Sequence, residues 1–265
     1  MKWAYDLTGA EPIIKDMPIY DAAAISAGEL VMLGASAWTA AADAGIALVT
    51  AYPSTVMANV AIDAVGICLE GKTTADVPSI ATAASVTTGN HCFGKVIINP
   101  FAVYRAEVTT ADGLSIASSA STGAFEVTGI PASAFNGSWV YFSASAGPNF
   151  GNIRKIVTSA TGGSQVMDSS VSATITTADK VILISERNKY PHQVSADALT
   201  MGQTTVGANG ATNIRVVENI IDRGTGLELL RTKTHSQKKV DSVQAKKTKF
   251  YQEIILKDHA FGLQE

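Results

Sequence analysis

The feature that most constrains this fold is a series of short apolar segments that turn residues separate. Eight of them are rich in β-branched and aromatic residues and are bounded by Gly, Pro, Asn or Asp: 28–34, 44–53, 95–110, 138–145, 153–161, 172–186, 213–221 and 249–256. Runs of this length and composition are typical of β-strands. Many short strands with turns between them predict an all-β protein, built as a β-barrel or a β-sandwich.

Signals for long helices are nearly absent. The stretch 237–247 suits a short helix, because Val240 and Val243 are three residues apart, and it suits a polar loop equally well. With 265 residues the chain is long enough to bury a sizeable core as one large domain or two modest ones, without a disulfide or a cofactor.

Charged residues form 16% of the chain, against about 25% in an average soluble domain. This deficit indicates a surface covered by partner chains or by small neutral side chains. The longest apolar candidate for a membrane span, 44–62, is interrupted by Pro53, and Asp6 and Glu11 interrupt the start of the chain where a secretory signal needs an apolar run. We therefore expect neither a membrane partner nor signal-dependent export.

Residues 66–73 read GICLEGKT and match the spacing of a nucleotide phosphate-binding loop. That loop requires a strand before it and a helix that begins at its Gly-Lys. Here Val65, Ile67 and Leu69 alternate as in a strand that occupies the place of the loop, and Pro78 follows too closely for a helix. We therefore predict a turn at Gly71-Lys72 and no cofactor.

Metal-binding and catalytic patterns are weak. The four histidines are far apart in the sequence, and the one Cys/His grouping consists of Cys68, His91 and Cys92. Neighbouring strand residues point to opposite faces, so His91 and Cys92 do not suit one metal ion, and we expect both cysteines to be buried and reduced. The sequence has no G-x-S-x-G nucleophile motif. We predict no metal site, no catalytic residues and no enzymatic activity.

Charged residues are the candidates for a protein interface. In 101–108, Arg105 and Glu107 lie on one face of a predicted strand, either presented to a partner or simply solvated. Residues 215–265 carry ten Lys+Arg and seven Asp+Glu, whereas the first 214 carry ten and sixteen. The basic candidates in this last segment are Lys238, Lys239, Lys246 and Lys247. They lack the aromatic spacing of a nucleic-acid site, so an acidic protein partner or solvent suits them better.

The stretch 109–187 is markedly rich in Ser, Thr, Ala and Gly and has its own strand-turn-strand rhythm. Loop tips on a β scaffold accept insertions readily. We therefore predict an inserted small β-module at 109–187 and a discontinuous main β-domain formed by 1–108 and 188–265.

Several stretches resemble auxiliary virion proteins of tailed bacteriophages, especially head decoration (cement) proteins. They are AAAISAGELVMLG, AVGICLEG, INPFAVYRAEV, GATNIRVVENIIDRGTGLELLRT and KKTKFYQEIILKDHAF, with GPNFGNIRKIVTSATGGSQVMDSS and TTADKVILI in the inserted stretch. The resemblance implies a non-enzymatic protein that decorates and stabilises an assembled capsid, often as a trimer or dimer. It also implies the major capsid protein as partner, synthesis in the host cytoplasm and a final place on the capsid surface of the virion.

Two alternatives stay open at this stage. The chain is also compatible with a tail, neck or head-fibre component of a virion. An enzyme is the alternative of another class, either a nucleotide hydrolase that uses Lys72 and Thr73 or a virion-borne glycan hydrolase.

Overall fold

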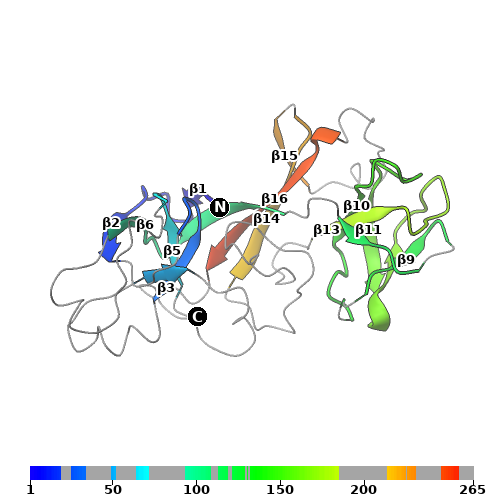
Figure 1. Cartoon of the computed structure of the whole chain (residues 1–265), viewed down its shortest axis with the longest axis horizontal. Coiled ribbons are helices and arrows are strands. Elements are labelled where there is room, and N and C mark those ends of the chain that lie inside the picture. Colours follow the sequence, from blue (N-terminus) through cyan, green and yellow to red (C-terminus); the bar gives the residue numbers. More distant parts are fainter. Residues whose placement is uncertain are drawn as a thin grey trace. The chain divides into compact units, whose positions relative to one another are not determined.

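A computed structural model describes a protein made almost wholly of β-strands (Figure 1). It describes residues 1–18, 25–33, 49–51, 64–71, 93–108, 113–118, 121–128, 130, 132–184, 214–224, 226–230 and 246–256. Within these ranges the helical residues are the 3-10 turn η1 (Thr161–Gly163) and the pair Lys246 and Lys247. The predicted all-β class is therefore confirmed.

The strands, in chain order, are β1 (Lys2–Asp6), β2 (Ile14–Pro18), β3 (Leu30–Leu33), β4 (Val49–Ala51), β5 (Ala64–Cys68), β6 (Phe93–Ile97), β7 (Ala102–Glu107), β8 (Leu114–Ser115), β9 (Ala124–Glu126), β10 (Trp139–Phe142), β11 (Ile153–Ser159), β12 (Ser164–Met167), β13 (Lys180–Ile184), β14 (Ile214–Asp222), β15 (Leu227–Leu229) and β16 (Lys249–Leu256). Each of the eight predicted segments overlaps at least one of them. The strand expected within GICLEGKT is also present, as β5.

Two predicted segments have the wrong extent. The segment 95–110 is two strands, β6 and β7, because Pro100 begins a turn in which the Ala102 N–H donates to the Asn99 carbonyl at 3.2 Å. Of the described residues in the segment 172–186, those of β13 alone form a strand. The residues before it form a turn that Asp179 closes, with its N–H 3.0 Å from the Thr176 carbonyl.

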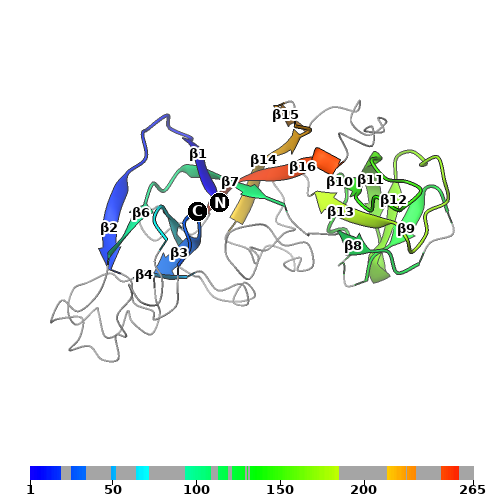
Figure 2. The ribbon, with the colours of Figure 1, turned by 45° about the horizontal axis from the view of Figure 1, so that its top comes forward.

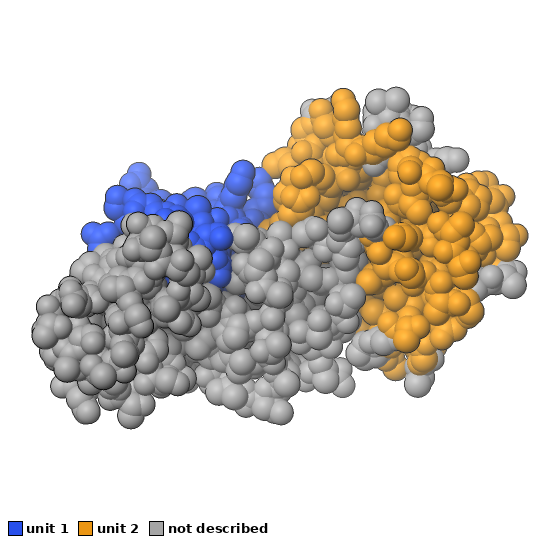
Figure 3. All heavy atoms as spheres, in the orientation of Figure 1, with its two compact units in different colours: residues 1–105, 194–199, 254–265 blue, residues 106–193, 200–253 orange. Residues whose placement is uncertain are grey.

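The chain divides into two compact units (Figure 3). Unit 1 comprises residues 1–105, 194–199 and 254–265, and unit 2 comprises 106–193 and 200–253. One five-stranded sheet has the order β1-β7-β16-β14-β15, and the division between the units falls within β7 and β16.

Unit 1 contains a second five-stranded sheet, in the order β2-β6-β5-β3-β4 (Figure 2). All of its strand pairs are antiparallel. One cluster of buried apolar residues in this unit is formed by Met17, Ile25, Val31, Val65, Cys68 and Val96. Ile67 and Ile97, which pair directly across β5 and β6, are also buried, although their side chains alternate with Cys68 and Val96. Both faces of β5 and β6 are therefore covered.

Unit 2 contains a six-stranded antiparallel sheet, in the order β8-β13-β10-β11-β12-β9. Its two ends join, because the chain just after β8 pairs with β9. The Ala117 N–H donates to the Glu126 carbonyl at 2.9 Å, and the Glu126 N–H donates to the Ser118 carbonyl at 3.0 Å. The sheet thus closes into a small barrel, which leaves no free edge in its strand order.

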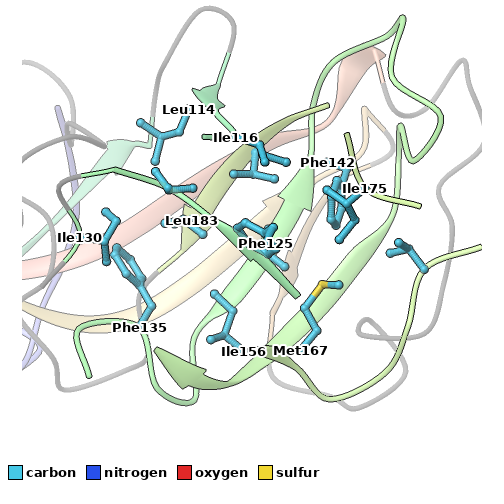
Figure 4. Packing of buried hydrophobic residues seen from close by; sticks show 14 residues of the cluster. Leu114, Ile116, Phe125, Ile130, Phe135, Phe142, Ile156, Met167, Ile175 and Leu183 are labelled. Carbon is cyan, nitrogen blue, oxygen red and sulfur yellow. The ribbon is translucent and has the colours of Figure 1, made fainter. Parts of the chain in front are cut away.

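The barrel has Greek-key connectivity. Strands β10, β11 and β12 are consecutive antiparallel neighbours, and β13 returns to pair with β10, which gives the spatial order 13-10-11-12. Fourteen buried apolar side chains fill the interior, and all of them come from residues 114–183 (Figure 4). Fully burying one large apolar side chain contributes about 1.5–3 kcal/mol, so this interior is the main source of stability of the barrel.

The outer face of β10 is covered as well. Tyr141 alternates with the interior residues Val140 and Phe142, and its ring lies 5.1 Å from that of Phe250 on β16. Burial raises the pKa of Tyr141 to about 12. A hydrogen bond with Thr248 lowers this pKa, but by less than burial raises it. The barrel is therefore packed on β16 within unit 2. The boundaries 109 and 187 of the inserted module stay a prediction, since unit 2 also includes 200–253.

Candidate functional site

The predicted charged pair on β7 is already engaged within the chain. Glu107 forms an ion pair with Lys249 of β16, with Lys249 Nζ 3.0 Å from Glu107 Oε1 and 3.2 Å from Oε2. The hydrogen bond and the charge of Glu107 raise the pKa of Lys249. Arg105 is half-buried and lies opposite Lys2 in the strand register. Glu107 therefore connects two strands of one sheet, and the interface role of Arg105 and Glu107 stays a prediction.

Two of the four predicted interface lysines are described. Lys246 and Lys247 are exposed and come just before β16, whereas Lys238 and Lys239 lie outside the described residues. The Lys247 side chain lies beside the turn between β14 and β15, where a Cβ added to Gly224 would lie 3.3 Å from Lys247 Cδ. Neither Lys246 nor Lys247 has an ion pair within the described part of the chain. Two exposed positive charges thus lie at the turn end of the β14-β15 hairpin, with no ion pair to another described residue.

All three residues of strand β15, next to these lysines, are exposed. Leu227 and Leu229 are 50% and 46% exposed, and Glu228 between them is exposed too. Strand β15 pairs with β14 through Ile220↔Leu229, Ile221↔Glu228 and Asp222↔Leu227, and it ends the strand order of its sheet. This edge strand was not predicted from the sequence. The alternation Leu-Glu-Leu after Gly226 was the available signal, but three residues are too few to predict a strand.

Other exposed apolar side chains lie on unit 1. Leu7 and Phe101 are 52% and 48% exposed and adjacent, because the Leu7 N–H donates to the Phe101 carbonyl at 3.1 Å. Ile13 and Ile14, before and at the start of the edge strand β2, are exposed by about the same fraction. Apolar residues grouped on a surface are typical of protein interfaces.

In the described residues 66–71 of the GICLEGKT segment, backbone N–H groups are already paired with carbonyl groups of the same chain. The N–H of Cys68 donates to the Glu29 carbonyl at 2.9 Å, and the N–H of Leu69 donates to the Lys95 carbonyl at 2.8 Å. A phosphate loop needs these groups free and directed at the ligand. Lys72 and Thr73, which would complete such a site, lie outside the described residues.

A cavity of about 340 Å³ opens beside the same segment, lined by residues 1–3, 27–28 and 67–69. Its lining is mostly apolar. Cys68 is buried, as expected, and its thiol donates to the Glu70 carbonyl at 2.9 Å. The cavity suits an apolar group but lacks the convergent polar groups that orient a substrate.

Metal ligands do not gather in the part of the chain that the structure describes, where no group of three or more His, Cys, Asp or Glu side chains is close enough to hold an ion. All four histidines and Cys92 lie outside that part. Within it, no helix is long and apolar enough to cross a membrane.

Buried polar side chains of the barrel form hydrogen bonds that hold its loops in place. Asp179 accepts from the Asn149 N–H at 3.1 Å, from Asn149 Nδ2 at 3.2 Å and from the Thr176 N–H at 3.0 Å. Arg154 donates through Nε and Nη2 to the Ser170 carbonyl, both at 3.3 Å, and burial lowers its pKa. These groups hold turns in place and present no open acid-base pair.

Comparisons with known proteins give no further identification. No family model, no curated protein and no solved structure matches this chain.

Proposed function

We propose that this chain is a non-enzymatic structural protein that decorates an assembled phage capsid and stabilises it. The observation that carries the proposal is the grouping of exposed apolar side chains on strands and turns: Leu7 with Phe101, Ile13 with Ile14, and Leu227 with Leu229. Groups of this kind suit binding through broad surfaces rather than through a pocket.

The composition supports the same proposal. With 16% charged residues, the surface loses little hydration free energy when neighbours cover it. A protein that binds the assembled shell but not its free subunits stabilises the shell by mass action, and many copies on one lattice gain avidity. The major capsid protein and further copies of this chain are the proposed partners, and the capsid surface is the proposed location.

The test is addition of purified full-length protein to preassembled empty heads, followed by sedimentation. We expect co-sedimentation that saturates at a copy number proportional to the number of capsid subunits, together with heads that resist heat better. A count by mass spectrometry that matches a single ring would instead support a neck or tail protein. A chain that ignores heads and hydrolyses a nucleotide, with activity lost in Lys72→Ala, would replace the proposal with the enzyme alternative.

A further inference from the structure

Among the described residues, strand β15 is a free edge with an unusual combination of properties. A free edge strand exposes a row of backbone N–H and C=O groups that can pair with another chain, and proteins normally protect such edges with charges or proline. Here two of the three side chains are leucines, each about half exposed. Within the described residues β15 pairs with β14 alone.

Strand β2, one edge of the other five-stranded sheet, is different. Strand β2 carries Lys15 and Asp16 in its centre and ends at Pro18, which are the usual protections of an edge. Strand β15 has one charge, Glu228, at its centre. Compared with β2, the β15 edge has little to prevent pairing with a partner strand.

A second copy of this chain is a poor occupant. A two-fold antiparallel pairing that uses all three residues of β15 would place Glu228 directly opposite Glu228 of the other copy, and Leu227 opposite Leu229. Like charges directly opposite each other destabilise a strand pair. The partner position across from Glu228 therefore suits a basic or hydroxyl side chain, which this chain does not offer in that register.

The lysines next to β15 indicate which further residues the partner segment carries. The Lys247 side chain lies beside Gly224 in the turn, so the exposed Lys246 and Lys247 lie near the Leu227 end of β15. Acidic residues on a partner would meet these charges if they came just beyond the residue that pairs with Leu227.

We propose that β15 binds an extended segment of a different protein by strand addition. The segment carries two apolar residues flanking one basic or hydroxyl residue that faces Glu228, and acidic residues that reach Lys246 and Lys247. Main-chain hydrogen bonds supply affinity and the alternating side chains supply selectivity. This deepens the proposed function, under which the segment belongs to the capsid protein, but binding at the edge is measurable without capsids.

The test uses fluorescent synthetic peptides of about nine residues with the core Thr-Val-Lys-Val-Thr. One peptide has two Asp at its carboxyl end, for antiparallel pairing, and one has them at its amino end, for parallel pairing. In the control peptides lysines replace the aspartates. We expect one acidic peptide to bind the full-length protein and to slow amide hydrogen exchange at residues 227–229, and the matching lysine peptide to bind about tenfold more weakly.

Substitutions on and away from β15 show where the peptide binds. Leu229→Lys should abolish it, whereas Val157→Lys, at a side chain of similar exposure on the barrel (51% against 46%), should leave it unchanged. The double variant Lys246→Glu, Lys247→Glu should reverse the preference between acidic and lysine peptides, and Lys15→Glu should not. The inference is overturned if no peptide protects these amides, or if the protein self-associates and Leu229→Lys makes it monomeric.

A parallel measurement with empty heads separates this inference from the proposed function. If peptides bind β15 but heads do not bind the protein, strand addition at β15 is supported and the proposed decoration of capsids is wrong. If heads bind the Leu229→Lys variant as tightly as the unchanged protein, the decoration role is supported, but β15 is not the surface that the capsid recognises.

Discussion

At the scale of single residues, Gly66 shows what the GICLEGKT motif does in this fold. Its φ is +148°, a conformation that favours glycine, and an added Cβ would lie 1.8 Å from the Ile97 carbonyl oxygen and 2.9 Å from the Tyr104 hydroxyl. The missing side chain lets β6 and the buried Tyr104 ring approach β5. The glycine that begins the phosphate-loop pattern is therefore required by packing.

Gly66→Ala should lower the free energy of unfolding by about 3 kcal/mol, since the new methyl group collides with backbone that has little room to move. Urea unfolding of the full chain measures this. Gly9→Ala is the matched control: φ is +78°, but nothing lies within 4 Å of the added Cβ, so we expect a loss of about 1 kcal/mol. Equal losses in the two variants would show that close packing at Gly66 is unimportant.

Asp6 is a second residue with a defined role. Its carboxylate accepts from the Thr8 N–H at 2.8 Å, from Thr8 Oγ1 at 2.5 Å and from Asn99 Nδ2 at 3.3 Å. Asn99 also accepts from the Ile13 N–H and donates to the Glu11 carbonyl at 3.0 Å. Burial by itself raises the pKa of Asp6, but the hydrogen bonds together outweigh it and the pKa lies below its usual value. Asp6 thus fastens the segment after β1 to the turn before β7.

We expect a pH-dependent contribution from Asp6. Because its pKa is lower in the folded than in the unfolded state, the contribution is complete above the unfolded value of about 3.9 and is lost as pH falls through the folded value. At pH 7 the variant Asp6→Asn should be less stable by about 1–2 kcal/mol. Thermal unfolding of both proteins from pH 7 downward tests this, and a difference that stays constant to pH 2 would contradict it.

At the scale of elements, the contact between Asn149 and Asp179 joins two long loops at one end of the barrel. Asn149 also receives the Ala173 N–H on Oδ1 at 3.3 Å, and its carbonyl accepts from Asn152 Nδ2 at 2.7 Å. Both Asn149 and Asp179 are fully buried. Gly147 packs against the carboxylate, since an added Cβ would lie 2.5 Å from Asp179 Oδ1.

Asp179→Ala should lower the free energy of unfolding by about 3 kcal/mol, because the buried donors of Asn149 and Thr176 lose their acceptor. Chemical unfolding measures the loss. Asp168→Ala is the control, as this carboxylate bonds on the surface to the Lys155 N–H and the Ser169 hydroxyl, and we expect less than about 1 kcal/mol. If the two variants are equally stable, the buried contact does not hold the loops.

At the scale of the whole molecule, the closed barrel has the properties of an independent folding unit. Its strand ring and its apolar interior use residues 114–184 alone. Its outer face is less independent, because Tyr141 packs on Phe250 from a distant part of the chain.

A fragment of residues 109–187 should therefore fold alone, but less stably than within the full chain. Two-dimensional NMR spectra of the fragment should show dispersed amide signals, and Phe142→Ala, which leaves a cavity in the interior, should cost about 3–5 kcal/mol. In the full chain Phe250→Ala should reduce stability, whereas the fragment already lacks that contact. An unfolded fragment would show that β16 is part of the folding unit.

Much of the secondary structure was predictable from the sequence. Alternation and β-branched composition identify β5, β10, β11, β14 and β16, since these signals depend on neighbours two residues apart. Short strands such as β8, β9 and β15 were not predicted, because two or three residues do not form a pattern. Of the interface candidates, the sequence indicated that Lys246 and Lys247 are charged and outward, but not which strand they accompany.

The sequence by itself therefore determined the class of this protein: an all-β chain with low charge and turns at defined places, because strand propensity and turn chemistry are local. Only the tertiary structure decided that β9 meets the chain after β8 to close a barrel, that Glu107 pairs with Lys249 and that β15 is left at an edge. Strand partners are chosen by contacts between residues far apart in the chain, and the shared packing of the interior selects one set of pairings.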